Sequence, residues 1–284
     1  MKDRIGRRFP RSPLLLLFLL LPPILVVSLP RDIHLTIAYE NKEQPPYYMG
    51  NTEEVLPRFP GIAVEMVQAL EEEIPRLRIT LVRVPWSRNL AGLGNNSYDG
   101  IFNASYRKDR LHLGWYPTTD GRHQGPPDPD RRITTLRYSL YRRRDSSLRW
   151  DGEGLRGTPS ALNALGAPLG YSIVQDMEQR GITVREVPGT TNALEMILLS
   201  RLEGAVLQDV TADALLAAEP ERFRLIVKEE IPLEEKDYFL MLSHRFVQAH
   251  PGLAQQIWDT LGEIRRTRSE ELHARYLPAR ATPD

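Results

Sequence analysis

The chain has 284 residues, enough for one large domain or two ordinary domains with a buried core. Lys and Arg together number 37, as do Asp and Glu, but five of the basic residues and only one acidic residue precede the first apolar run. The rest of the chain is therefore mildly acidic, which argues against a nucleic-acid-binding surface. The absence of cysteine excludes disulfides, thiol catalysis and a lipid-modified N-terminal cysteine.

The N-terminus has the pattern of a secretory signal peptide. Basic residues lead into an uncharged, apolar run over residues 14–29, which is shorter than the roughly 20 residues that a transmembrane helix needs. We therefore expect residues 1–28 to be a signal peptide. Because Ser28 is a weak cleavage signal, an uncleaved N-terminal anchor is the alternative. Export without a lipid anchor predicts location in the periplasm of a Gram-negative bacterium.

The residues after the apolar run alternate between strand and helix patterns. Strand patterns occupy residues 33–39, 78–84 and 98–104, and helical patterns lie between them at 61–73 and 85–93. This order predicts a parallel sheet with helical crossovers. Ligands of such sheets bind beyond the carboxyl ends of the strands.

Polar and aromatic residues stand at or just beyond these strand ends, namely Glu40, Trp86, Asn103, Ser105 and Arg110. The Asn/Ser loop offers amide and hydroxyl groups, and Arg110 offers a planar, bidentate fork. We therefore expect this loop to hold a small anion, the alternative being a solvated basic turn. For Trp86 the alternative is a packing position in the core, and for Glu40 it is a solvated position on the surface.

Residues 117–132 are turn formers and charged residues without apolar periodicity, which predicts an exposed loop. Its single histidine has no metal-ligand spacing, so we expect no metal site. A second alternating unit follows, with strand patterns near residues 183–187, 204–207 and 224–228. Extended patterns at residues 136–142 and 236–243 connect the two units, and the C-terminal part is helical.

These patterns predict an α/β protein of two lobes joined by two hinge crossings, with a ligand cleft between the lobes. Lobe 1 is expected to comprise residues 31–138 and 243–284. Lobe 2, inserted between them, is expected to comprise residues 143–237. Asp209 follows a lobe 2 strand, so it either faces the cleft or caps the next helix.

Short motifs in this order resemble the periplasmic solute-binding proteins of family 3, which serve polar amino acid ABC transporters. The motifs, spread over about residues 31–277, are Ile37-Ala-Tyr-Glu40, Pro45-Pro-Tyr47, Gly61-Ile-Ala-Val-Glu-Met66, Val84-Pro-Trp86, Tyr98-Asp-Gly100, Ala104-Ser-Tyr106, Arg110, Val187-Pro-Gly-Thr190 and Leu207-Gln-Asp209. The resemblance implies the two-lobed periplasmic-binding-protein-like fold of type II.

The resemblance also implies roles in binding the ligand's α-carboxylate. Arg110 would clamp it, helped by Ser105 and by Asn103, which stands where the family often has serine. The turn of Tyr171 and Ser172 at a helix N-terminus would add donors. The sequence departs from the family pattern at Asn103 and Tyr171.

The rest of the ligand would meet four other residues. By the same resemblance, Asp209 would bind the α-ammonium, so that a cation and an anion on opposite lobes are both satisfied only when the cleft closes. Glu40 would face the ligand's side chain, and Tyr47 and Trp86 would form aromatic walls. The loop 117–132 lies outside the common pattern, and the sequence does not identify the ligand.

We expect a non-enzymatic, monomeric binding protein without cofactor or metal, which captures a polar amino acid or related small carboxylate and delivers it to the membrane permease of an ABC transporter. The sequence has no Gly-x-Ser-x-Gly, His-Glu-x-x-His or phosphate-loop motif. Two alternatives stay open. One is an enzyme on the same fold, of the cyclohexadienyl dehydratase type, with Glu40 as general acid. The other is an orphan or sensory amino-acid receptor.

Overall fold

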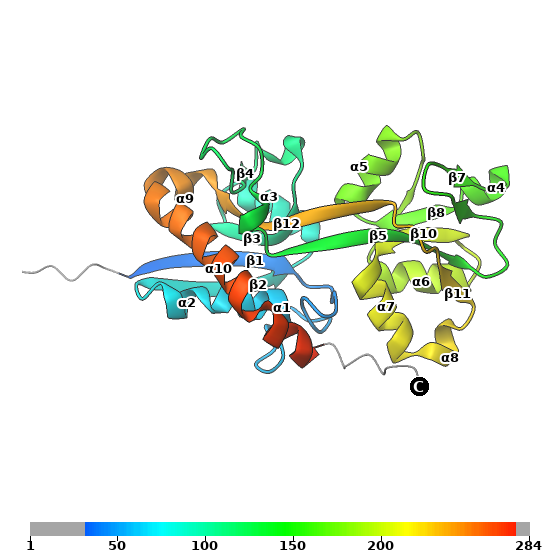
Figure 1. Ribbon diagram of the computed structural model, residues 1–284, viewed down its shortest axis with the longest axis horizontal. Coiled ribbons are helices and arrows are strands. Elements are labelled where there is room, and N and C mark those ends of the chain that lie inside the picture. The colour runs from blue at the N-terminus through cyan, green and yellow to red at the C-terminus, as the bar shows by residue number, and fades with distance from the viewer. Residues whose placement is uncertain (1–31, 277–284) are drawn as a thin grey trace, which may run out of the picture. The chain divides into compact units, whose positions relative to one another are not determined.

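The computed structural model describes residues 32–276. The predicted signal peptide over residues 1–28 lies outside this range. The described residues alternate strands and helices in two α/β units, as the hydrophobic patterns predict (Figure 1). Within residues 32–276, no helix combines the length and the apolar character that crossing a membrane requires.

The first unit is built from elements between residues 33 and 115. It comprises β1 (Ile33–Glu40), α1 (Ile62–Gln68), α2 (Leu70–Glu73), β2 (Leu77–Val84), α3 (Trp86–Gly94), β3 (Gly100–Ser105), the short helix η1 (Lys108–Arg110) and β4 (Gly114–Trp115). The single helix expected over residues 61–73 is divided at Ala69 into α1 and α2. The division is slight, because Ala69 keeps right-handed helical angles (φ −61°, ψ −17°).

The second unit and the segments around it complete the chain. The second unit comprises β6 (Arg149–Trp150), β7 (Leu155–Arg156), α4 (Pro159–Leu162), β8 (Leu165–Pro168), α5 (Ser172–Gln179), β9 (Arg185–Val187), α6 (Thr190–Leu198), β10 (Gly204–Gln208), α7 (Asp209–Ala218), α8 (Pro220–Phe223) and β11 (Ile226–Lys228). Around it lie η2 (Pro129–Arg131), the long strands β5 (Thr134–Arg143) and β12 (Glu234–Ser243), and the helices α9 (His244–Ala249) and α10 (Pro251–Tyr276).

One sheet takes in strands of both units, in the order β2-β1-β3-β12-β5-β10-β8-β9. β1 pairs in parallel with β2 and β3, and β8 pairs in parallel with β9 and β10. Between these parallel groups, β5 and β12 pair antiparallel and run side by side (Figure 1). These two strands are the predicted extended crossings. The residue boundaries predicted for the two lobes stay a prediction.

The core of the first unit fixes the strands that carry the polar residues. Leu35, Ile37 and Tyr39 of β1 are buried, and the Tyr39 ring stacks on Phe102 of β3 with ring centroids 4.9 Å apart. Each buried apolar side chain of this size contributes about 1.5–3 kcal/mol. Trp258 of α10 is fully buried, and its Nε1–H donates to the Leu240 carbonyl of β12 at 2.9 Å. The C-terminal helix therefore holds β12 in place.

The residues of loop 117–132 are mostly exposed or half-buried, as expected, and the loop is attached to the rest of the structure at several points. Arg131 donates to Gln255 at 2.8 Å and pairs with Asp259 at 2.7 Å, both on α10. The His123 ring lies 4.7 Å from the Trp115 ring of β4. None of the loop's residues lines the cavity described below.

Candidate functional site

A buried cavity lies where the carboxyl ends of β1 and β3 meet the segment that begins α5. Its lining residues are Glu40, Gln44, Tyr48, Trp86, Asn103, Ser105, Arg110, Tyr138, Tyr171, Ser172, Gln208 and Tyr238. The structure thus brings together seven of the nine residues singled out in the sequence, namely Glu40, Trp86, Asn103, Ser105, Arg110, Tyr171 and Ser172. Parallel strands end at one edge of a sheet, which explains why residues after different strands meet here.

Arg110 places a positive charge at this cavity. The residue is 4% exposed, and its Nη1 donates to the Ser105 carbonyl at 3.0 Å, while Nη2 donates to the Gly170 carbonyl at 3.1 Å. The guanidinium also lies over the Trp86 ring, 5.4 Å from its centroid. Within residues 32–276 no carboxylate forms an ion pair with Arg110. A buried charge without a counter-charge is costly, so the arrangement favours an anionic ligand.

Glu40 is the carboxylate of the cavity lining. It is buried, and its Oε2 accepts hydrogen bonds from Tyr171 Oη at 2.7 Å and from Gln44 Nε2 at 2.8 Å. Burial raises the pKa of Glu40 to about 7, although these two hydrogen bonds and the charge of Lys42 act in the opposite direction. Near neutral pH this side chain is therefore present in both forms, so it can accept or donate a hydrogen bond.

Residues 170–172 carry the contacts that reach across the cavity. The Gly170 carbonyl accepts from Trp86 Nε1 at 3.2 Å as well as from Arg110, and Ser105 Oγ donates to Ser172 Oγ at 2.8 Å. Gly170 has a left-handed φ of 71°, which glycine adopts at little cost. This turn directs the carbonyl toward the cavity just before α5 begins.

Several buried polar atoms at the cavity lack hydrogen-bond partners. They are Nδ2 and Oδ1 of Asn103 and Oε1 of Gln208. Asn103 lies beside Tyr48 without a hydrogen bond of good geometry between them. Its φ of 59° is left-handed, a conformation that asparagine tolerates better than most residues. Unsatisfied buried polar atoms cost about 1–3 kcal/mol each, and a polar ligand would satisfy them.

Five lining residues were missed by the sequence analysis, namely Gln44, Tyr48, Tyr138, Gln208 and Tyr238. Tyr138 of β5 and Tyr238 of β12 join their hydroxyl groups at 2.7 Å, and Gln208 Nε2 donates to Tyr238 Oη at 2.9 Å. The tyrosines lie in the predicted crossing segments, at the start of a continuous buried run in each strand, and a hydroxyl group at such a position is the signal that could have found them. The lining therefore offers many more hydrogen-bonding groups than the sequence motifs predict.

Two predicted site residues do not line the cavity. Tyr47 is buried, and its hydroxyl accepts from Thr134 Oγ1 at 3.2 Å. Asp209 is buried at the start of α7, where Oδ2 lies 3.1 Å from Nε of Arg137 and 3.6 Å from Nζ of Lys228. Their contacts with a ligand stay predictions.

The cavity leaves little room between these groups. Its free volume is about 10 Å³, enough for roughly one water molecule. A ligand of several heavy atoms therefore fits only if residues 170–172 move away from Arg110 and Trp86. The two strands β5 and β12 are the connections about which such a movement could occur.

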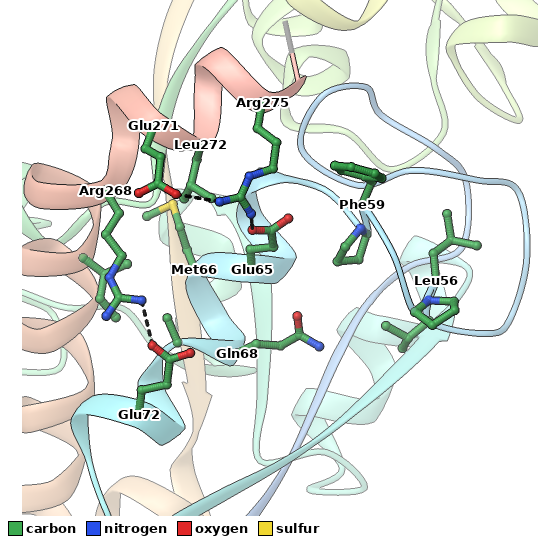
Figure 2. Close-up of a pocket in the computed structure, with 15 residues that line it drawn as sticks. Leu56, Phe59, Glu65, Met66, Gln68, Glu72, Arg268, Glu271, Leu272 and Arg275 are labelled. Carbon is green, nitrogen blue, oxygen red and sulfur yellow. Dashed lines mark hydrogen bonds and ion pairs between the residues drawn. The ribbon is translucent and has the colours of Figure 1, made fainter.

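A roomier hollow of about 600 Å³ lies on the first unit, between α1, α10 and the loop of residues 55–60. Figure 2 shows that its charged side chains are turned toward one another: Arg268 donates to Glu72 at 2.8 Å, and Arg275 donates to Glu271 at 2.6 Å and to Glu65. Within the described residues, none of its lining side chains leaves a buried polar atom unpartnered. A polar ligand would therefore satisfy fewer unpartnered groups in this hollow than in the cavity at Arg110.

No protein-family model matches the chain, and no curated protein sequence matches it. Several solved structures, in contrast, align with most of the chain. A histidine kinase sensor domain with similarity to periplasmic binding proteins aligns with a TM-score of 0.66 and 17% identity, covering 87% of this chain and 97% of that domain. The alignment with an ABC uptake transporter substrate-binding protein from Streptococcus pneumoniae with bound histidine has a TM-score of 0.63 and 14% identity, covering 88% of this chain and 95% of that one.

The chain has the two-lobed fold of periplasmic binding proteins. The GluR0 ligand-binding core in complex with L-glutamate aligns equally well, with a TM-score of 0.64, 15% identity and coverage of 87% of this chain and 99% of that one. The periplasmic-binding-protein-like fold expected from the sequence motifs is thereby confirmed. At these identities the likeness concerns the fold, and function has to be argued from the cavity.

Proposed function

We propose that the chain is a periplasmic solute-binding protein of family 3, which captures a polar amino acid or a related small carboxylate between its lobes. The observation that supports this best is the buried guanidinium of Arg110, which has no carboxylate partner within residues 32–276 and lies at a cavity with unpartnered atoms of Asn103 and Gln208. A carboxylate matches the planar fork of arginine, and charge-assisted hydrogen bonds of this kind are roughly twice as strong as neutral ones.

Binding would exchange contacts inside the protein for contacts with the ligand. When the lobes separate, Arg110 loses the Gly170 carbonyl and Glu40 loses the Tyr171 hydroxyl. A ligand carboxylate would take the place of the Gly170 carbonyl at Arg110, and other polar groups of the ligand would bond to Asn103 and Gln208. Closure over the ligand would present one conformation to a membrane permease of an ABC transporter.

A sensory role is the second candidate, because a histidine kinase sensor domain has this fold and 97% of it is covered by the alignment. Both roles would use the same ligand-binding step. They would differ in the protein that the ligand-bound form contacts: a permease in transport, a signalling protein in sensing. Co-purification from the native membrane distinguishes the two roles: a permease as the partner supports transport, and a signalling protein supports sensing.

An enzyme of the cyclohexadienyl dehydratase type is the third candidate, supported by the pKa of about 7 of Glu40, which suits a general acid at neutral pH. We favour a binding protein, because Glu40 is held by hydrogen bonds from Tyr171 and Gln44. Among residues 32–276, no second carboxylate lines the cavity. Turnover of prephenate or arogenate by the purified chain would favour the enzyme, and loss of that turnover in Glu40→Gln would establish it.

The proposed function is tested by thermal unfolding of the purified full chain with amino acids, hydroxy acids and dicarboxylates. A ligand that binds only the folded state raises the melting temperature. Arg110→Ala should abolish the rise for every carboxylate ligand, and Arg110→Lys should reduce it, because lysine keeps the charge but not the fork. Arg107→Ala is the matched control, since Arg107 pairs with Asp109 outside the cavity lining. Binding at full strength by Arg110→Ala would refute the proposal.

A further inference from the structure

Asp209, the residue expected to hold a ligand ammonium group, already has its charge neutralised by the protein. Its Oδ2 lies 3.1 Å from Nε of Arg137 and 3.6 Å from Nζ of Lys228, and its Oδ1 accepts from the backbone N–H of Val210 at 2.7 Å. The side chain is 4% exposed. Both oxygens of this carboxylate are therefore engaged, and little of its surface is open to a further partner.

The two cations at Asp209 come from different elements and are not equivalent. Lys228, at the end of β11, is shared with Asp213 at 2.7 Å, and Asp213 in turn accepts from Tyr141 Oη at 2.6 Å. Arg137, on the crossing strand β5, forms no other ion pair within residues 32–276. Of the two cations, Arg137 is therefore the one that neutralises Asp209 without being shared with another carboxylate.

A ligand ammonium group would meet like charge at this position. It would have to approach a carboxylate flanked by the positive charges of Arg137 and Lys228. Both charges oppose a third cation there, although solvent screens Arg137, whose side chain is 55% exposed. The cavity lining contains Glu40 but not Asp209. Glu40 already accepts from Tyr171 and Gln44, and in its protonated form it can donate to a ketone or hydroxyl oxygen.

We propose that Arg137 takes the place of a ligand ammonium group at Asp209, so that the cavity binds small carboxylates without an α-ammonium, such as α-oxo and α-hydroxy acids, in preference to the matching α-amino acids. This inference rests on the proposed function, because it assumes that Arg110 binds a ligand carboxylate. Within that function it narrows the ligand class and assigns to Arg137 a role in specificity.

The test uses ligands that differ only in the α-substituent. Binding of L-alanine, L-leucine, L-phenylalanine and L-glutamate to the full chain is compared by calorimetry with binding of their α-oxo and α-hydroxy analogues. At least one oxo or hydroxy acid should bind the wild type about tenfold or more tightly than its amino acid. Arg137→Gln, which frees Asp209, should lower this ratio at least tenfold. Arg143→Gln, an arginine on the same strand that pairs with Asp145, should leave the ratio unchanged.

A second substitution separates specificity from a merely structural effect of Arg137. Asp209→Asn alone should leave amino acid binding unchanged, whereas combined with Arg137→Gln it should cancel the gain in amino acid binding. The inference is overturned if wild-type protein binds the amino acids as tightly as their analogues, or if Arg137→Gln leaves the ratio as it was while Arg110→Ala still abolishes binding. If only other amino acids bind, the inference is overturned and the proposed function stands. If no carboxylate of this panel or of the thermal-unfolding panel binds, the proposed function itself fails.

Discussion

Tyr171 and Glu40, 131 positions apart in the sequence, are joined by a hydrogen bond of 2.7 Å from the phenol to the carboxylate. The contact links the start of α5 to the end of β1, and both residues are buried. Because it crosses the cavity, it contributes to holding the two units together. Gln44 also bonds to the Tyr171 hydroxyl, so the phenol is fixed from two directions.

Tyr171→Phe should destabilise the protein by about 1–3 kcal/mol, because it leaves buried Glu40 and Gln44 each short of a partner. Urea unfolding of the variant measures the loss. The matched control is Tyr276→Phe, which removes a similar bond to Glu65 at a partly exposed position and should cost less than about 1 kcal/mol. Equal losses in the two variants would contradict a special role for the buried contact.

Glu40 should make stability fall as the pH rises from about 4.5 to about 7. Its pKa in the folded state is raised from 4.5 to about 7 by burial, so between these values the folded chain binds more protons than the unfolded chain. Glu40→Gln removes this dependence and should raise the free energy of unfolding at about pH 8 by up to roughly 3 kcal/mol, with little change below pH 4.5.

Urea unfolding at several pH values between about 4 and 8 checks this prediction. Glu53→Gln, at an exposed position, is the control and should leave the pH profile unchanged. A Glu40→Gln profile parallel to that of the wild type would mean that folding leaves the pKa of Glu40 unchanged, and would contradict the prediction.

Gly170→Ala should destabilise the protein by about 1–2 kcal/mol and weaken the contacts of Arg110. At φ 71° an added Cβ strains the backbone that positions the Gly170 carbonyl, whereas its distance of 3.4 Å from Cδ1 of Trp86 is ordinary van der Waals contact. Gly181→Ala is the matched control, because Gly181 has a φ of 73° with nothing within 4 Å of the added Cβ. Thermal unfolding of both variants separates the backbone strain, which they share, from the effect at the cavity. If both lose the same stability, the strain at position 170 does not disturb the contacts of its carbonyl with Arg110 and Trp86.

The hydroxyl pair of Tyr138 and Tyr238 should show coupling in a double-mutant cycle. Each hydroxyl bonds to the other at 2.7 Å, and Gln208 Nε2 bonds to both. We expect the two single Tyr→Phe variants to lose more stability together than the double variant does, with a coupling of about 0.5–1.5 kcal/mol. Chemical unfolding of the four proteins provides the measurement. Additive losses would show that the two crossing strands are not joined through these side chains.

The part of the site that follows from local rules could be predicted. Glu40, Asn103 and Arg110 stand at or beyond the ends of parallel strands, and strand ends of one parallel group meet at one edge. The alternation of apolar residues likewise predicts both α/β units and the two crossing strands. These features depend on periodicity within short windows of sequence.

The remainder depends on pairings that local patterns do not contain. Tyr138 and Tyr238 meet because β5 and β12 pair in a particular register, and sequence periodicity does not fix the register between strands 100 residues apart. Gln208 reaches the cavity and Asp209 does not, since β10 ends and α7 begins between them. The ion pair of Asp209 with Arg137 is a tertiary contact, which periodicity within short windows of sequence does not predict.

The acceptor that Arg110 and Trp86 share is a backbone carbonyl, that of Gly170. A mutation can alter a side chain at a cavity wall, but no replacement at position 170 can remove a carbonyl oxygen. The main-chain acceptor of Arg110 and Trp86 therefore persists whatever side chain stands at position 170, while the other residues of the cavity lining can diverge with the ligand. Relatives with different ligands should retain an arginine and a ring N–H that meet a main-chain oxygen at the same place.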